Sequence, residues 1–157
     1  TLEWIDYGSE AGLDELGAAL LKARLGRQFS DAKRRKIIWQ KLYDGLEQWA
    51  MSLDIRLPKV LPESEPSYCA FHIVMPTADM RDGILRHLRQ KGIEARKPGI
   101  PLHQSRMGKA LGTQPSLCRI TEKMVSRLVY LPMRADLTDD EVEMLISTTA
   151  TRRSLVD

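Results

Sequence analysis

The histidine at position 103 follows a rigid turn in the stretch KGIEARKPGIPLHQS, residues 91–105. Pro98 and Pro101 each fix a backbone φ angle just before it, so the turn has little conformational entropy to lose when a ligand binds. His103 is therefore either a functional group presented to a ligand or an ordinary histidine of a polar loop. The residues of this stretch alone leave both interpretations open.

The other residues that can do chemistry do not form a recognised site. Cys69 and His72 are three apart in an expected strand, so their side chains leave opposite faces and do not share a metal ion. His87 falls on an expected helix, and Cys118 has no partner at metal-ligand spacing. The chain has no G-x-S-x-G elbow, no Walker loop and no G-x-G-x-x-G motif. We therefore expect no metal site and no catalytic residue of these kinds.

The charge of the chain argues against a dedicated nucleic-acid-binding protein. Its formal net charge is only +3, because 24 basic residues face 21 acidic ones, whereas such proteins carry a clear basic excess on one face. The basic run at residues 33–36 can contact phosphates or act as a localisation signal. Four consecutive helical residues point in four directions, however, and Asp31, Asp44 and Glu47 are close in sequence. We therefore favour a solvated helix surface for this run.

Length and composition indicate one soluble domain. The chain has 157 residues, 43% of them hydrophobic, which is enough for one core of ordinary size. No apolar run reaches the roughly 18 residues of a membrane span, and the opening TLEWIDYGSE is unlike a secretory signal. Cys69 and Cys118 are expected to be free core thiols, which favours a reducing cytoplasm.

The first third of the chain is expected to form two consecutive helices. Leucines recur at helical spacing in residues 12–28, with Asp14 near the start and Gly26 near the stop. A second helix is expected at residues 30–53, where a stripe of apolar side chains begins at Ile38. Three prolines without periodicity then make residues 56–67 a connector.

The remaining chain is expected to alternate short strands with helices. The expected strands are 68–75, 93–97 and 128–133, and the expected helices are 77–93, 116–128 and 137–153. Asp79 can cap the first of these helices, and Gly92 can terminate it. The second helix is expected to turn Leu117, Ile120 and Met124 inward, and the third opens with a Thr138-x-x-Glu141 capping box.

This order of elements predicts an α/β (α+β) fold. Helices packed on one face of a small sheet, with two helices before it, give a sandwich with a single core. From the residues alone, no function beyond that of a soluble α/β domain follows.

Four ordered blocks resemble the C-terminal part of the DegT/DnrJ/EryC1/StrS family of pyridoxal-phosphate sugar aminotransferases. Residues 4–25, WIDYGSEAGLDELGAALLKARL, resemble its W-x-D-x-G-S-S-Y segment and following helix. Residues 34–46, RRKIIWQKLYDGL, resemble its Arg-rich helix that ends in a tyrosine. Residues 92–103, GIEARKPGIPLH, are similar to G-I-x-x-x-x-H-Y-x-P-L-H, and residues 128–146 are similar to its L-x-L-P-L-x-x-x-L-T-D-x-E ending. The W-x-D-x-G-S opening most resembles the dTDP-4-amino-4,6-dideoxygalactose type of transaminase.

The resemblance implies the small C-terminal domain of a fold type I enzyme over residues 1–157. Residues 1–53 would be the connecting helices and residues 54–157 the α/β sandwich, with the large cofactor-binding domain absent from this chain. Relatives are homodimers with sites at the subunit interface, so exposed apolar surface is expected on the first two helices. The implied reaction moves an amino group from glutamate to a keto-sugar nucleotide in the cytoplasm, with no nucleic acid or membrane as partner.

The same resemblance assigns candidate site residues. Ser9 and Glu10 would bind the phosphate of pyridoxal phosphate, and His103 would face the nucleotide-sugar substrate. Several family residues are replaced: Glu10 stands for a serine or asparagine, while Pro98 and Gly99 stand for the His-Tyr pair. A carboxylate beside a phosphate dianion is repulsive unless it is neutralised.

Because a Schiff-base lysine is not found, more than one function of the chain stays open. No lysine of the chain lies where the family forms its Schiff base, so the chain alone is not expected to transaminate. It is either part of a working sugar aminotransferase or a degenerate member that keeps the fold as an association or binding module. An unrelated α/β binding domain is the third interpretation, which the four ordered blocks disfavour.

Overall fold

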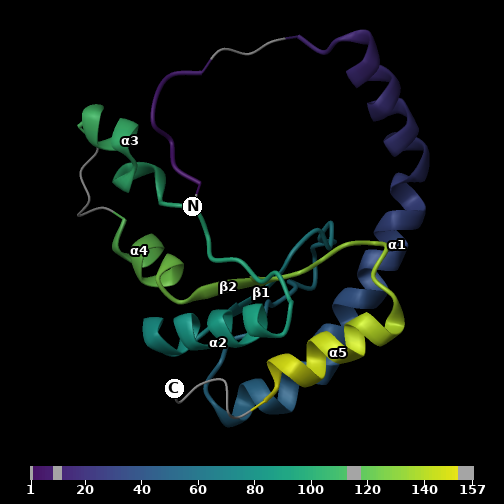
Figure 1. Ribbon diagram of the computed structural model, residues 1–157, viewed down its shortest axis with the longest axis vertical. Helices are drawn as coiled ribbons and strands as arrows, with labels where there is room; N and C mark the ends of the chain where they lie inside the picture. Colours follow the sequence, from purple (N-terminus) through teal and green to yellow (C-terminus); the bar gives the residue numbers. More distant parts are fainter. Residues whose placement is uncertain (1, 9–11, 113–117, 152–157) are drawn as a thin grey trace.

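A computed structural model describes residues 2–8, 12–112 and 118–151 of the chain. These residues form one long helix, a two-stranded sheet and several shorter helices (Figure 1). The combination of helices with a small sheet agrees with the expected mixed fold. The number and length of the elements differ from the expectation in several places.

The first third of the chain forms a single helix, α1 (Glu15–Ser52), so the prediction of two helices is wrong. Asp14 caps its start, where its carboxylate accepts a hydrogen bond from the amide of Gly17 at 2.6 Å. Gly26 does not end the helix, because an internal glycine costs only about 1 kcal/mol relative to alanine and the surrounding residues are strong helix formers. Ser30, which was expected to start a second helix, donates its hydroxyl to the carbonyl of Arg27 within α1.

The sheet consists of β1 (Phe71–Val74) and β2 (Leu128–Leu131), which pair antiparallel. Both strands lie inside segments that were expected to be extended, and both carry the apolar residues that favour strands. The expected strand at 93–97 contributes only an isolated bridge between Arg96 and Tyr130. Within the described residues the sheet therefore has two strands where three were expected.

Helix α2 (Ala78–Gln90) follows β1, and its cap differs from the expectation. Thr77 is the cap, since its hydroxyl accepts a hydrogen bond from the amide of Met80 at 3.2 Å, and Asp79 lies in the first turn. Gly92 follows the end of the helix with a φ of +77°, a left-handed conformation that favours glycine. The prediction that Gly92 terminates this helix is confirmed.

The described residues between α2 and β2 form three short elements. They are η1 (Leu102–Gln104), α3 (Arg106–Ala110) and α4 (Arg119–Val125). Helix α4 is shorter than the expected helix at 116–128, and its Ile120 is 81% exposed, so the prediction that Ile120 faces inward is wrong. Met124 is half-buried, and Leu117 lies outside the described residues.

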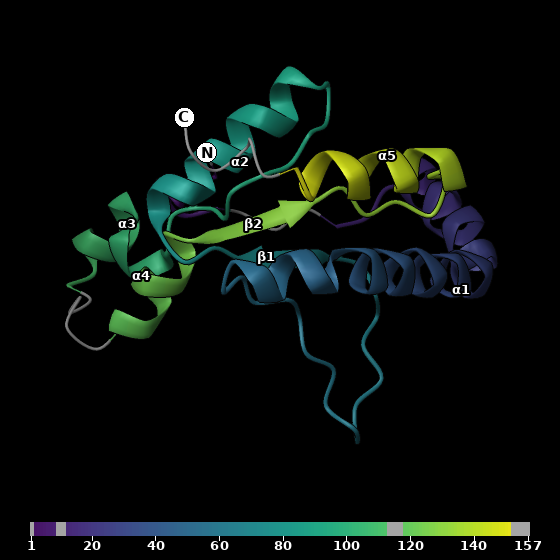
Figure 2. The same cartoon turned by 90° about the horizontal axis from the view of Figure 1, so that it is seen from below.

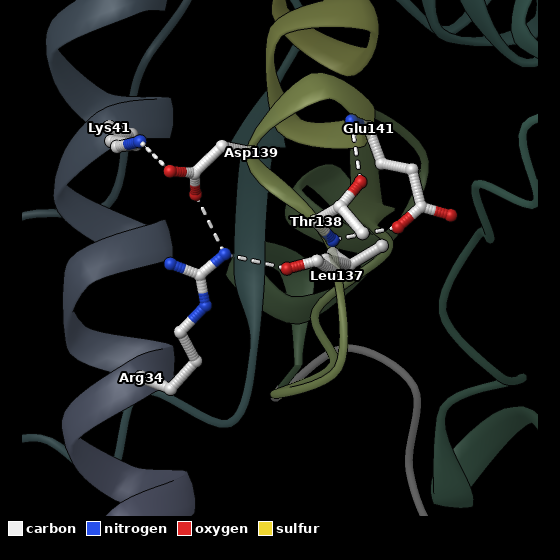
Figure 3. Close-up of polar contacts among 6 residues, drawn as sticks. All are labelled: Arg34, Lys41, Leu137, Thr138, Asp139 and Glu141. Atoms are coloured by element: carbon white, nitrogen blue, oxygen red, sulfur yellow. Dashed lines mark hydrogen bonds and ion pairs between the residues drawn. The ribbon is translucent and has the colours of Figure 1, made fainter.

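The last helix, α5 (Asp139–Thr149), lies beside α1 in both views (Figures 1 and 2). Its capping box is present as predicted: the amide of Glu141 donates to the Thr138 hydroxyl, and the Thr138 amide donates to the Glu141 carboxylate. Figure 3 shows this box beside the polar contacts that join α5 to α1. The first turn of α5 is thus positioned by its own capping residues and by contacts with α1.

Asp139 links α5 to two cations of α1. Its carboxylate lies 2.8 Å from Arg34 Nη2 and 3.1 Å from Lys41 Nζ, and Arg34 also donates to the carbonyl of Leu137 at 2.7 Å (Figure 3). The basic run at 33–36 is therefore not simply a solvated helix surface, because Arg34 contacts α5. Lys36 of the same run lies 3.8 Å from Glu65.

The core lies where α1, α2 and α5 meet the sheet. Its buried apolar side chains come from every large element and include Ile38, Trp39, Leu42, Leu46, Phe71, Ile73, Ile84, Leu88, Val129, Leu131, Val142 and Leu145. Only the second half of α1 contributes to this core. The connector between α1 and β1 extends away from the rest of the molecule (Figure 2).

The first half of α1 projects beyond the core (Figure 1). It carries apolar side chains that are exposed to solvent. The exposed residues here are Leu16, Leu20, Leu21, Leu25 and Phe29, of which Phe29 is 76% exposed. The expected exposure of apolar surface at this end of the chain is confirmed. A helix with apolar side chains on several sides is typical of one that is covered by other parts of a protein.

Both cysteines are free thiols, but Cys69 is exposed and Cys118 is half-buried. The prediction that they are core thiols is therefore wrong for Cys69. Cys69 precedes β1 rather than lying within it, so its side chain is not part of the alternating pattern of the strand.

We expect the Asp139→Asn variant to change the pH dependence of stability. Hydrogen bonds from Arg34, and then from Lys41, lower the pKa of Asp139 below its ordinary value. A carboxylate with a lowered folded-state pKa stabilises the fold above its unfolded pKa of about 4 and loses this contribution as the pH falls. Thermal unfolding should therefore show a Tm gap between the two proteins that is largest near neutral pH and closes below about pH 4. A Tm gap that is equal at all pH values would contradict the lowered pKa of Asp139.

Candidate functional site

The turn at 98–101 is held in place by the N-terminal segment. The amide of Ile100 donates to the carbonyl of Leu2 at 3.0 Å, and the amide of Met107 donates to the carbonyl of Trp4 at 3.2 Å. A Cβ atom at Gly99 would lie 3.0 Å from the Leu2 carbonyl oxygen, so glycine permits this close approach. Gly99 thus packs against the start of the chain.

His103 lies in η1 and is only 8% exposed. The interpretation of His103 as an ordinary exposed loop histidine is therefore wrong. Its Nε2 atom lies 2.9 Å from Oε1 of Glu122 in α4. Because an ionised carboxylate only accepts hydrogen bonds, this contact orients the imidazole with an N–H toward Glu122.

The contact with His103 also acts on Glu122. The hydrogen bond from His103, followed by one from Gln104, lowers the pKa of the Glu122 carboxyl group. Glu122 is therefore ionised near neutral pH, and it joins the turn that carries His103 to helix α4. Sequence reasoning did not identify Glu122, because it is separated from His103 by 19 positions and no motif links them.

A hollow of about 310 Å³ lies beside this pair. Its lining includes Arg81 from α2, Pro98 from the turn, the preceding Lys97, and Gln104 and Glu122. Arg81 Nε lies 2.8 Å from Asp82 Oδ1, with a side chain that is 13% exposed. The hollow therefore offers hydrogen-bond donors and acceptors on several sides, as a site for a polar ligand requires.

Two small residues support the position of His103. The amide of Gly108 donates to the Ser105 hydroxyl at 3.0 Å, and that hydroxyl donates to the carbonyl of Leu102 at 2.6 Å. A Cβ atom at Gly108 would overlap the same carbonyl. Sequence reasoning also missed Ser105 and Gly108, although a serine directly before the first residue of a helix is a capping signal.

The expected cofactor residues Ser9 and Glu10 lie outside the described residues, so their relation to His103 is not part of the structure. His72 lies in β1 with its ring 6.4 Å from that of Tyr130, and burial lowers the pKa of its imidazole. Among residues 2–8, 12–112 and 118–151, no group of three or more His, Cys, Asp or Glu side chains has the geometry of a metal site. The helices within the same ranges are too short or too polar to cross a membrane.

Comparison with known proteins gives one family. The family model of the DegT/DnrJ/EryC1/StrS aminotransferase family matches residues 2–149. The erythromycin biosynthesis sensory transduction protein EryC1 of Saccharopolyspora erythraea is 28% identical over 145 residues. That alignment covers 90% of this chain and 37% of EryC1, so the chain spans little more than a third of its curated relative.

Solved structures agree in fold. The aminotransferase TlmJ from Streptoalloteichus hindustanus superimposes with a TM-score of 0.74 at 27% identity, covering 86% of this chain and 35% of TlmJ. DesV of S. venezuelae, solved in complex with a ketimine intermediate, gives a TM-score of 0.80 at 24% identity. It covers 97% of this chain and 40% of DesV, and at this identity it supports the fold alone.

Proposed function

Because the chain belongs to the DegT/DnrJ/EryC1/StrS aminotransferase family, we propose that it is the C-terminal portion of a nucleotide-sugar aminotransferase. The proposed reaction transfers an amino group from glutamate to a keto-sugar nucleotide. The observation that carries this proposal is the family match across residues 2–149, which agrees with the likeness to the aminotransferase TlmJ. The proposed setting is the cytoplasm, in keeping with two free thiols.

In the proposed domain organisation, residues 1–53 are connecting helices and residues 54–157 form a small domain. A large domain outside this chain would bind the cofactor and cover the first half of α1. The exposed side chains of Leu20, Leu25 and Phe29 support this arrangement, because large apolar patches of soluble proteins are usually interaction surfaces. A second subunit would complete the assembly as a homodimer.

The chain's own residues do not fit the attachment of pyridoxal phosphate. When bound, this cofactor supplies the electron sink for amino transfer, and its lysine needs a lowered pKa, which burial provides. Every lysine of this chain is exposed or half-exposed, and Lys41 is paired with Asp139. We therefore assign no chemical step through the cofactor to this chain.

The proposed role of this chain is to bind and orient the substrate. Glu122, which lines the hollow beside the turn, would form part of the wall of the substrate site. The buried His103 would act on the substrate through Glu122, whose carboxylate it holds in place by the 2.9 Å contact. The rigid turn at 98–101 would keep this wall in place without a large loss of entropy on binding.

A degenerate, non-catalytic member of the family is the second candidate function. The observation that favours it is the replacement of the family's His-Tyr pair by Pro98 and Gly99, together with Glu10 where a phosphate would lie. In that case the chain acts as an association or binding module.

Assays of amino transfer separate the two candidates. We expect the protein encoded by the longest reading frame ending in this chain to convert a dTDP-linked keto-sugar with glutamate, while the present chain shows no turnover. In the longer protein, His103→Ala should lower kcat/KM by about tenfold or more, mainly through KM, because Glu122 in the wall of the substrate site loses the partner that holds it. His87→Ala, which alters a half-buried histidine of α2, is the matched control. Absence of turnover by a folded longer protein would favour the binding module.

A further inference from the structure

Residues 93–97 lie at an edge of the sheet, where Arg96 bridges to Tyr130 of β2. The amide of Arg96 donates to the Tyr130 carbonyl at 2.9 Å, and the Tyr130 amide donates to the Arg96 carbonyl at 2.7 Å. Both main-chain groups of Arg96 therefore face β2. Because these groups alternate in direction along an extended chain, those of Ala95 and Lys97 point away from β2.

Several main-chain groups on this outer side have no partner. Among the described residues, no hydrogen bond joins the Ala95 carbonyl, the Lys97 amide or the Lys97 carbonyl to another residue. The Ala95 amide is used within the segment, since it donates to the carbonyl of Ile93 at 3.0 Å. Pro98 biases the preceding Lys97 toward the extended conformation. An extended edge with unpaired amide and carbonyl groups is a template to which another chain can add as a strand.

A hollow of about 960 Å³ is lined by this edge segment and by one flank of α2. The lining from the edge comes from residues 92–97, and part of the hollow is apolar through Leu85, Ile93 and Ala95. An added strand would thus find room beside the edge and apolar contacts for some of its side chains.

The charged side chains of this hollow are mainly cations. They are Arg86, Arg89, Arg96 and Lys97, against the carboxylates of Asp82 and Glu94. Asp82 already contacts Arg81, whose Nε atom lies 2.8 Å from its Oδ1 atom. Arg89, Arg96 and Lys97 are exposed, and none of them forms an ion pair with a described carboxylate. The hollow therefore favours an acidic partner over a basic one.

We propose that an extended acidic peptide segment of another protein binds along this edge as an added strand. Its main chain pairs with the amide and carbonyl of Lys97, and its carboxylates contact the guanidinium groups of Arg89 and Arg96. A nucleic acid satisfies only the cations, because it has no main chain that pairs with a sheet edge. The interaction goes beyond the proposed function and does not depend on it.

Fluorescence anisotropy of a labelled peptide of alternating glutamate and threonine, titrated with the present chain, tests the inference. We expect a dissociation constant of about 0.1 mM or below. Glutamine in place of each glutamate of the peptide should weaken binding at least about tenfold, because the charge complementarity is lost. N-methylation of every second amide of the peptide should weaken binding at least about fivefold, because it blocks strand pairing and keeps the charge.

Charge variants of the chain locate the contact. Arg89→Gln should weaken binding at least about threefold. Arg24→Gln, which alters an exposed arginine of α1 outside the hollow, is the matched control and should leave binding unchanged. Glu94→Gln should strengthen binding about twofold or more, because the hollow then loses a carboxylate that repels the peptide.

Four results would overturn the inference. They are undetectable binding of the peptide, full binding of its N-methylated form, equal effects of Arg89→Gln and Arg24→Gln, and weaker binding by Glu94→Gln. Single-stranded DNA of the same net charge is the remaining probe, and it should bind more weakly than the peptide. Equal or tighter binding of the DNA would also contradict strand addition, because charge alone would then explain the contact.

Discussion

The Gly108→Ala variant is expected to lose about 3 kcal/mol of unfolding free energy, at the upper end of the range for overpacking. A Cβ atom at this position would overlap the main-chain carbonyl of Leu102, with the Cα of His103 3.0 Å away. Backbone atoms cannot move aside as the end of a flexible side chain can. Urea denaturation followed by circular dichroism measures the loss.

Gly26→Ala is the matched control for this variant, because Gly26 is also helical but nothing lies within 4 Å of its added Cβ atom. Alanine should stabilise α1 there by about 0.5–1 kcal/mol, since it removes the entropic cost of glycine in a helix. The two substitutions should therefore act in opposite directions. Equal effects would contradict the close packing of α3 against η1.

The Leu42→Ala variant is expected to lose about 2–5 kcal/mol of unfolding free energy. Leu42 is fully buried in the second half of α1, where it is part of the core between that helix and the sheet. Its removal leaves a cavity as well as a loss of transfer free energy. Thermal or urea unfolding of the chain measures the difference.

Leu20→Ala is the control within the same helix, because Leu20 is exposed in the first half of α1. In the present chain it should change the unfolding free energy by about 0.5 kcal/mol or less. In a protein that contains the proposed large domain, the same change should cost more, because Leu20 would then be buried. A cost in the present chain similar to that of Leu42→Ala would contradict the placement of the core.

The parts of the fold that were predicted correctly are those set by local interactions. The start of α5 follows from the Thr138–Glu141 capping box, and the end of α2 follows from Gly92. Both signals act over three or four residues, so they are visible in the sequence. The two strands also follow from short runs of β-branched and aromatic residues.

The parts that were missed depend on contacts between distant residues. Whether residues 93–97 form a strand depends on how many of them pair with β2. In the structure only Arg96 does so, through a single bridge. The long α1 continues through Gly26 because the second half of the helix is anchored in the core, and this support is not encoded near the glycine. The burial of His103 depends in the same way on Glu122, which the chain brings close only when it folds.

The candidate site followed from the resemblance more than from residue types. The P-L-H segment identified His103, but its partner Glu122 and the hollow beside them were visible only once the elements were placed. Ser9 and Glu10 remain predictions, because they lie outside the described residues.

The most direct test of the central claim is the visible absorbance of pyridoxal phosphate bound to two purified proteins. One is the present chain, and the other is the product of the longest reading frame that ends in it. The account predicts that only the longer protein acquires a stable absorbance band at a longer wavelength than that of the free cofactor. The reason is that no lysine of this chain is buried. A stable band with the present chain, or none with a folded longer protein, would contradict the claim that this chain is the substrate-binding portion of an aminotransferase.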